Sequence, residues 1–115
     1  MKYKLIFTLG YSYDSEALLK GYRSDVLLLD EKGSFYEINF VEPQVISNAF
    51  DGTIFCYLET NLVVLSSVSR ENIIKVVSEL HRWKFFLRWH PLPIETVEKF
   101  FFPMDKWDIL DVIVF

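Results

Sequence analysis

Ser-Asp-Val-Leu-Leu-Leu-Asp-Glu-Lys-Gly-Ser-Phe-Tyr-Glu-Ile-Asn-Phe-Val, residues 24–41, is the stretch that decides the fold. Two apolar runs, each of strand length, flank the polar segment 30–34. Within that segment, Gly33 can adopt the left-handed backbone that a tight turn requires. In the second run, apolar and polar side chains alternate, which predicts a strand with one buried face. We therefore predict a β-hairpin, whose second strand buries Tyr36, Ile38 and Phe40.

Further elements are predicted on both sides of the hairpin. Residues 2–9 alternate in the manner of a strand, whereas residues 15–22 fit either a short helix that ends at Gly21 or an extended segment. The clearest helix begins after Ser69, because apolar residues recur at helical spacing, namely Ile73, Val76, Val77, Leu80 and Trp83. The other predicted helices are 43–50 and 93–101, and the other predicted strands are 54–58, 62–68, 84–89 and 107–115.

These elements predict one globular domain that spans residues 1–115. Its 115 residues, 51% of them hydrophobic, suffice for a single core. Because strands precede the main helix, the expected class is α+β: a mostly antiparallel sheet of five to seven strands with two or three helices packed on one face. No apolar run approaches the roughly 20 residues of a membrane helix, and we see no signal peptide. The lone cysteine, Cys56, cannot form an internal disulfide, so we expect a cytoplasmic protein.

The distribution of charge limits the classes of function that the chain can have. The net charge of -4 argues against a general nucleic-acid binder and suits a basic protein partner. Residues 66–90 carry five basic and two acidic side chains, whereas residues 91–115 carry two basic and five acidic ones. The basic part includes residues 82–89, where Arg and Lys alternate with Trp and Phe. That pattern suits single-strand stacking or, more simply, rings packed inward with cations outside.

Catalytic and metal-binding signals are weak. His81 and His90 flank the basic stretch and would allow acid–base cleavage of RNA, but they equally suit structural positions. No cysteine or histidine pair has metal-ligand spacing, and no two glycines form a phosphate-binding loop. We therefore expect no cofactor, no metal and no enzymatic activity.

The candidate binding residues are acidic or aromatic. The first set lies near the C-terminus and comprises Asp105, Trp107, Asp108 and Asp111. On a strand, Asp108 would face away from Asp111, and Trp107 would serve as an aromatic anchor. A second set is Asp14 and Glu16, close to residues 11–13. Exposed carboxylates also serve simple solubility, so that interpretation stays open.

Several short motifs resemble a known group of proteins. They are Tyr11-Ser-Tyr13, Ser24-Asp-Val26 with Gly33-x-x-Tyr36, and Asn61-Leu-Val-Val64 followed by Val68-Ser-Arg-Glu-Asn-Ile73. Together they resemble the small immunity proteins that accompany polymorphic bacterial toxins, including those of contact-dependent growth inhibition. The resemblance covers residues 1–80, and residues 91–115 match no pattern of the group.

The resemblance implies an antitoxin. Such a protein would bind a cognate toxin domain, often a nuclease with a basic substrate surface, and would cover its active site or substrate groove. We expect a monomer or weak homodimer without direct nucleic-acid or membrane contact. Two alternatives are a small RNA-cleaving enzyme that uses His81 and His90, and a non-catalytic oligomeric structural module.

Overall fold

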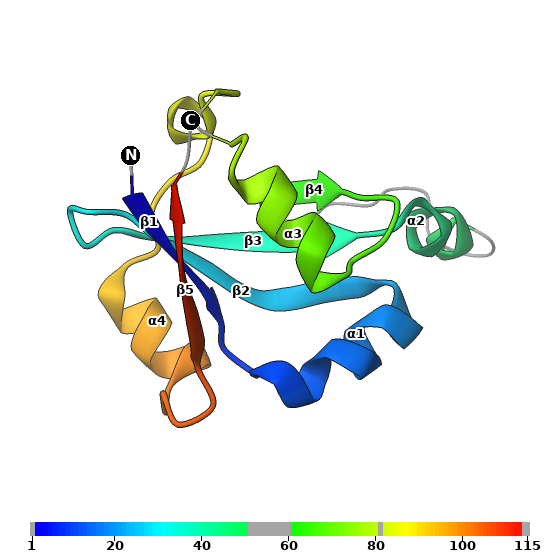
Figure 1. The fold of residues 1–115 in the computed structure, drawn as a ribbon, viewed down its shortest axis with the longest axis horizontal. Coiled ribbons are helices and arrows are strands. Elements are labelled where there is room, and N and C mark those ends of the chain that lie inside the picture. Colours follow the sequence, from blue (N-terminus) through cyan, green and yellow to red (C-terminus); the bar gives the residue numbers. More distant parts are fainter. Residues whose placement is uncertain (1, 51–60, 81, 114–115) are drawn as a thin grey trace.

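The structure, a computed structural model, describes residues 2–50, 61–80 and 82–113. Its strands are β1 (Lys2–Phe7), β2 (Tyr22–Leu29), β3 (Phe35–Val41), β4 (Leu62–Val64) and β5 (Asp108–Ile113). Its α-helices are α1 (Asp14–Lys20), α2 (Pro43–Ala49), α3 (Arg70–Val77) and α4 (Ile94–Phe101), and two short 3-10 helices are η1 (Tyr11–Tyr13) and η2 (Phe85–Leu87). Figure 1 shows how the helices are arranged around the sheet that the strands form.

The five strands form one sheet in the order β4-β3-β2-β1-β5. Neighbouring strands are antiparallel except for β3 and β4, which run parallel. The predicted hairpin is confirmed, since β2 and β3 pair with Leu28 opposite Tyr36. At its turn, Gly33 has a φ of 89°, and the Asp30 carboxylate accepts hydrogen bonds from the backbone N–H groups of Lys32 and Ser34.

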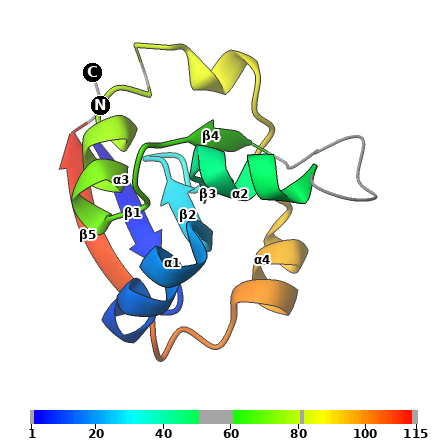
Figure 2. The same ribbon diagram turned by 90° about the vertical axis from the view of Figure 1, so that its right-hand side faces the viewer.

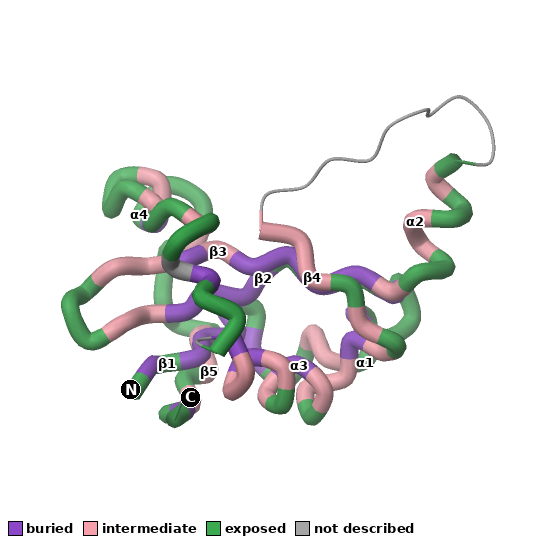
Figure 3. Tube along the Cα trace, turned by 90° about the horizontal axis from the view of Figure 1, so that it is seen from above, coloured by how far each residue is buried: buried purple, intermediate pink, exposed green. Residues whose placement is uncertain are grey.

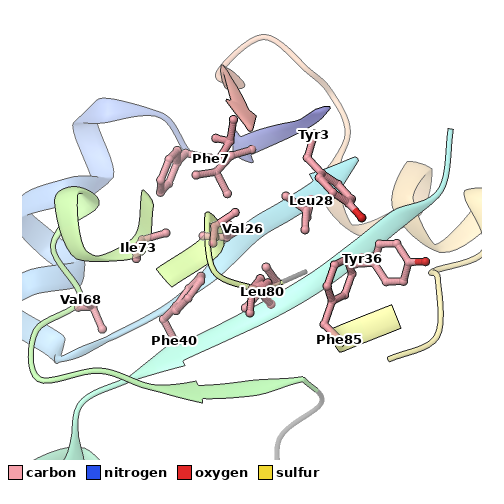
Figure 4. Close-up of a cluster of buried hydrophobic side chains, with 14 residues drawn as sticks. Tyr3, Phe7, Val26, Leu28, Tyr36, Phe40, Val68, Ile73, Leu80 and Phe85 are labelled. Atoms are coloured by element: carbon pink, nitrogen blue, oxygen red, sulfur yellow. The ribbon is translucent and has the colours of Figure 1, made fainter. Parts of the chain in front are cut away.

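The main core lies between one face of the sheet and α3. Side chains of β1, β2 and β3 point to this face, and Figure 4 shows them packed against Ile73 and the residues that follow α3. The cluster comprises Tyr3, Leu5, Phe7, Val26, Leu28, Tyr36, Ile38, Phe40, Val68, Ile73, Val77, Leu80, Phe85 and Val112. A smaller cluster on the opposite face joins Ile6 and Leu27 to Val97 of α4.

The predicted α+β class with a mostly antiparallel sheet is confirmed, and the described residues form four α-helices where two or three were expected. The placement of the helices on one face needs correction, because α3 and α4 lie on opposite sides of the sheet (Figures 2 and 3). The physical reason lies in the central strands. Residues 5–7 of β1 and residues 26–28 of β2 are all buried, so both faces of these strands require cover.

The segment after the main helix also differs from expectation. Helix α3 ends at Val77, capped at its start by Ser69, whose side chain accepts a hydrogen bond from the backbone N–H of Asn72. Trp83 therefore leaves the predicted buried stripe and is exposed. The strand predicted at 84–89 is wrong, because Lys84 has a φ of 55° and a 3-10 helix, η2, follows it. A left-handed residue interrupts the extended backbone that a strand needs.

Other local expectations have mixed outcomes. Most of the ambiguous segment 15–22 belongs to helix α1, which ends at Lys20 and is followed by its capping residue Gly21 with a φ of 75°. The strand predicted at 62–68 is shorter and ends at Val64. The strand expected at 54–58, with Cys56, lies outside the described residues, as does His81. None of the helices in the described ranges has both the length and the apolar character that a bilayer crossing demands.

Candidate functional site

Two of the predicted binding residues, Asp14 and Asp108, belong to an internal ion-pair network centred on Arg70. This arginine opens helix α3. Its Nε and Nη2 donate to the two carboxylate oxygens of Asp14 at 2.9 and 3.0 Å, and its Nη1 donates to Asp108. Arg23, a fully buried residue of β2, donates to Asp14 at 2.6 Å and to Asp25 at 2.7 Å. The network joins α1, β2, α3 and β5.

Aromatic rings enclose the Arg70 guanidinium. Its central carbon lies 3.9 Å from the ring centre of Phe7 and 3.8 Å from that of Tyr11, so it is stacked between the two rings. Burial alone would lower the pKa of Arg70, but the hydrogen bonds that Arg70 donates to Asp14 and Asp108 outweigh the effect of burial and raise this pKa. Burial alone would raise the pKa of the Asp14 carboxyl, but Arg70 and Arg23 lower it.

This geometry gives Asp14 and Asp108 a structural role. Both carboxylates neutralise arginines of their own chain, and their side chains are only 27% and 21% exposed. The charge that they offer a partner is therefore largely compensated. Their involvement in binding stays a prediction, while their part in holding the sheet to α1 and α3 follows from the contacts.

Trp107 is likewise engaged within the fold. Its indole Nε1 donates to the carbonyl oxygen of Phe101 at 2.9 Å, and its ring packs edge-on against Phe35 and Phe102. The residue is half-buried directly before β5. Trp107 thus secures the connection between α4 and β5 and presents only part of its ring to a partner.

The other predicted residues are exposed but do not form one cluster. Asp111 lies opposite Lys4 in the sheet, with 3.6 Å between its carboxylate and the Lys4 ammonium, while Glu16 pairs with Lys20 at 3.2 Å on α1. Asp105 lies in the loop before β5. The strand register places Asp108 opposite Phe7, hence on the other face from Asp111, as predicted.

An exposed apolar surface next to Asp105 was missed by the sequence analysis. We call it the α4–β5 patch and define it as Leu9, Phe100 and Phe102, three exposed residues that line one groove. Phe100 is 68% exposed. Two adjoining grooves, of about 310 and 190 Å³, both contact Leu9 and Phe100, and Asp105 lines the larger one.

A sequence signal for this surface exists in the run Phe100-Phe-Phe102. Successive residues of a helix point about 100° apart, so consecutive rings at its end cannot all face one core. In the structure, Phe101 packs against the smaller core cluster, while Phe100 and Phe102 are exposed. Three consecutive phenylalanines at the end of a helix therefore indicate that at least one ring is exposed.

The described residues do not support the alternative of an RNA-cleaving enzyme that uses His81 and His90. His90 is exposed in the irregular segment after η2, and His81 lies outside the described residues, so the pair cannot be placed. Within residues 2–50, 61–80 and 82–113, no group of three or more His, Cys, Asp or Glu side chains is arranged to hold a metal ion. Comparison with family models, curated proteins and solved structures finds no match to this chain.

Proposed function

We propose that this chain is an immunity protein that acts in the cytoplasm by binding and neutralising a cognate bacterial toxin domain. The observation that carries the proposal is the α4–β5 patch, where large exposed apolar side chains line a groove together with Asp105 and Lys106. Covering the toxin's active site or basic substrate groove requires affinity but no catalytic group.

The patch has the composition of a protein-binding surface. Exposed apolar side chains that gather in one place, with polar residues at their rim, are typical of interaction sites. Phe100 and Phe102 provide ring area, and Asp105 and Lys106 provide charges of opposite sign in the lining of the same groove. In protein interfaces a few such anchors contribute most of the binding free energy.

Charge supports the choice of a basic partner. The chain carries a net charge of -4, which attracts a basic domain and accelerates encounter at low ionic strength. Asp111 and Glu16, away from the patch, contribute to this attraction over distance and not to close contact. Many toxin domains that act on nucleic acids expose basic substrate surfaces, so we propose a nuclease domain as the target.

Titration calorimetry against the toxin domain encoded beside this gene tests the proposal. We expect tight binding by the unaltered chain and a loss of about 2 kcal/mol, near thirtyfold in affinity, for Phe100→Ser. The matched control is Leu19→Ser, because Leu19 is an 89% exposed apolar residue of α1 outside the patch. Absence of binding at micromolar concentrations, or equal effects of both variants, would remove the proposal.

The contribution of Asp105 is tested separately by association kinetics. Asp105→Lys reverses the charge next to the patch, so we expect slower association with the toxin domain and a weaker dependence of the association rate on salt. Glu16→Lys on α1 is the control for a change of equal charge at a distance. If the two variants slow association equally, Asp105 has no specific place in the interface.

A further inference from the structure

Strand β5 forms a free edge of the sheet. All six of its residues pair with β1 in one continuous antiparallel register, and the strand order places no described strand beyond it. Figure 2 shows β5 at the outer margin of the sheet. Among the described residues, no backbone hydrogen bond outside this ladder involves residues 108–113. Every second residue of β5 therefore directs its N–H and C=O away from β1, where another strand can bind them.

The edge at β5 lacks most features that block strand addition. Proteins usually protect an edge with proline, lysine, a bulge or a very short strand. The sequence of β5 contains no proline, glycine, lysine or arginine, and its register with β1 has no bulge. The opposite edge of the described sheet, β4, is only three residues long. Of the two described edges, β5 therefore offers the longer template.

Three exposed side chains of β5 set the chemistry of an added strand. They are Ile109, Asp111 and Ile113, which lie on the α4 side of the sheet because Ile109 is opposite Ile6. Ile109 and Ile113 are 48% and 57% exposed. The Asp111 side chain is 79% exposed and has Lys4 of β1 at 3.6 Å on one side, with no described strand on the other. The free edge thus presents a carboxylate between two isoleucines.

We propose that β5 binds an extended strand of a partner protein whose alternate side chains are apolar, basic and apolar. Residues directly opposite in neighbouring strands point to the same side of a sheet, so the basic side chain would lie against Asp111 and the apolar ones against Ile109 and Ile113. Strand β1 already shows part of this complement on the other side, since Ile6 is opposite Ile109 and Lys4 is opposite Asp111. The backbone groups of the edge require an extended partner, and the three side chains determine its sequence pattern.

The same pattern disfavours β5 of a second copy as the occupant. Two identical strands related by a two-fold axis and paired with Ile109 opposite Ile113 place Asp111 opposite its own counterpart, because position 111 is midway between them. Like charges directly opposite destabilise a strand pair. Shifting the pairing by two residues puts Asp111 opposite an isoleucine and leaves it without a cation from the second copy. The partner is therefore a different strand, one that carries a lysine or arginine.

An NMR titration of the isotope-labelled full chain with a short synthetic peptide tests the proposal. The peptide has a central lysine, two isoleucines at the alternate positions beside it, and threonines between them. We expect amide shift changes concentrated in residues 108–113, and binding about fivefold weaker when glutamate replaces the lysine of the peptide. Leu9, Phe100 and Phe102 take no part in this contact, and the experiment contains no toxin, so its outcome is independent of the proposed toxin binding.

Variants at Asp111 test the choice of partner. Asp111→Asn should bind the lysine and glutamate peptides equally, and Asp111→Lys should prefer the glutamate peptide. Glu16→Lys is the matched control, because it makes the same change of charge at an exposed position of α1 and should keep the preference for lysine. If Asp111→Lys and Glu16→Lys have the same preference, the peptide responds to net charge and not to the edge.

A peptide of the same sequence with N-methylated backbone amides tests the strand pairing itself. It keeps every side chain and loses the N–H donors, so we expect no binding. Retained binding of this peptide would overturn the inference, as would the absence of shift changes at millimolar concentrations of the lysine peptide, or changes confined to residues outside β5. Concentration-dependent shifts of residues 108–113 without peptide would show that a second copy occupies the edge, contrary to the proposal.

Discussion

Replacing Arg70 by methionine should destabilise the protein strongly. From the sequence alone, an arginine in the first turn of a helix would be expected to be exposed and to tolerate this change. The substitution keeps an unbranched apolar side chain between Phe7 and Tyr11 and removes only the guanidinium. Asp108 then loses the arginine that neutralises it, and Asp14 retains only Arg23.

The size of the effect follows from this geometry. Removing one member of a buried ion pair costs about 3–5 kcal/mol, because the other charge stays desolvated. The side chains of Asp14 and Asp108 keep 27% and 21% of their exposure, so water compensates a part of that cost. We therefore expect the unfolding free energy to fall by about 3 kcal/mol, which lowers the urea midpoint by about 2 M for a slope near 1.5 kcal/mol per M.

Urea unfolding followed by tryptophan fluorescence measures this change. Arg82→Met is the matched control, because it removes the same group from an exposed pair with Glu79 and should cost less than about 0.5 kcal/mol. A cycle that combines Arg70→Met with Asp108→Asn should show coupling of about 1–2 kcal/mol. If Arg70→Met lowers the unfolding free energy no more than Arg82→Met does, the ion-pair network does not stabilise the fold and the reasoning is wrong.

Three further predictions concern Asp14, Ser69 and Trp107. The pKa of Asp14 is lowered below its usual 3.8, so the stability it contributes is present above that value and is lost as the pH falls through the folded pKa; urea titrations should show this loss, and Asp14→Asn should remove it. Ser69→Ala should cost about 1 kcal/mol of unfolding free energy, because the cap to Asn72 disappears, and an unchanged urea midpoint would dismiss the cap. Trp107→Phe should cost about 1 kcal/mol through the lost bond to the Phe101 carbonyl, and equal thermal stability would contradict that value.

Much of the fold was predictable because its signals are local. Alternation over residues 35–41 and the glycine at position 33 predict the hairpin, and the stripe after Ser69 predicts α3. The second covered face of the sheet was harder to foresee. It depends on Ile6 and Leu27, single residues whose burial is decided by α4, which lies far away in the sequence.

The candidate site was predictable only in part because carboxylates look alike in sequence. Asp105 and Asp108 are three residues apart, yet the first is exposed and the second pairs with Arg70. That pairing spans 38 positions, and the pairing of Arg70 with Asp14 spans 56. Such contacts depend on strand order, which spacing along the chain does not reveal. Trp83 was predicted to be buried and is exposed. The helical spacing of apolar residues continues in the sequence beyond Val77, where the helix ends.

The central claim is that this protein works by binding a toxin domain through the α4–β5 patch. Amide hydrogen exchange of the chain, alone and with the toxin domain encoded beside it, tests that claim most directly. We predict that added protection concentrates in residues 97–106 and at Leu9. Protection restricted to other parts of the chain, or none at saturating toxin, would contradict the claim.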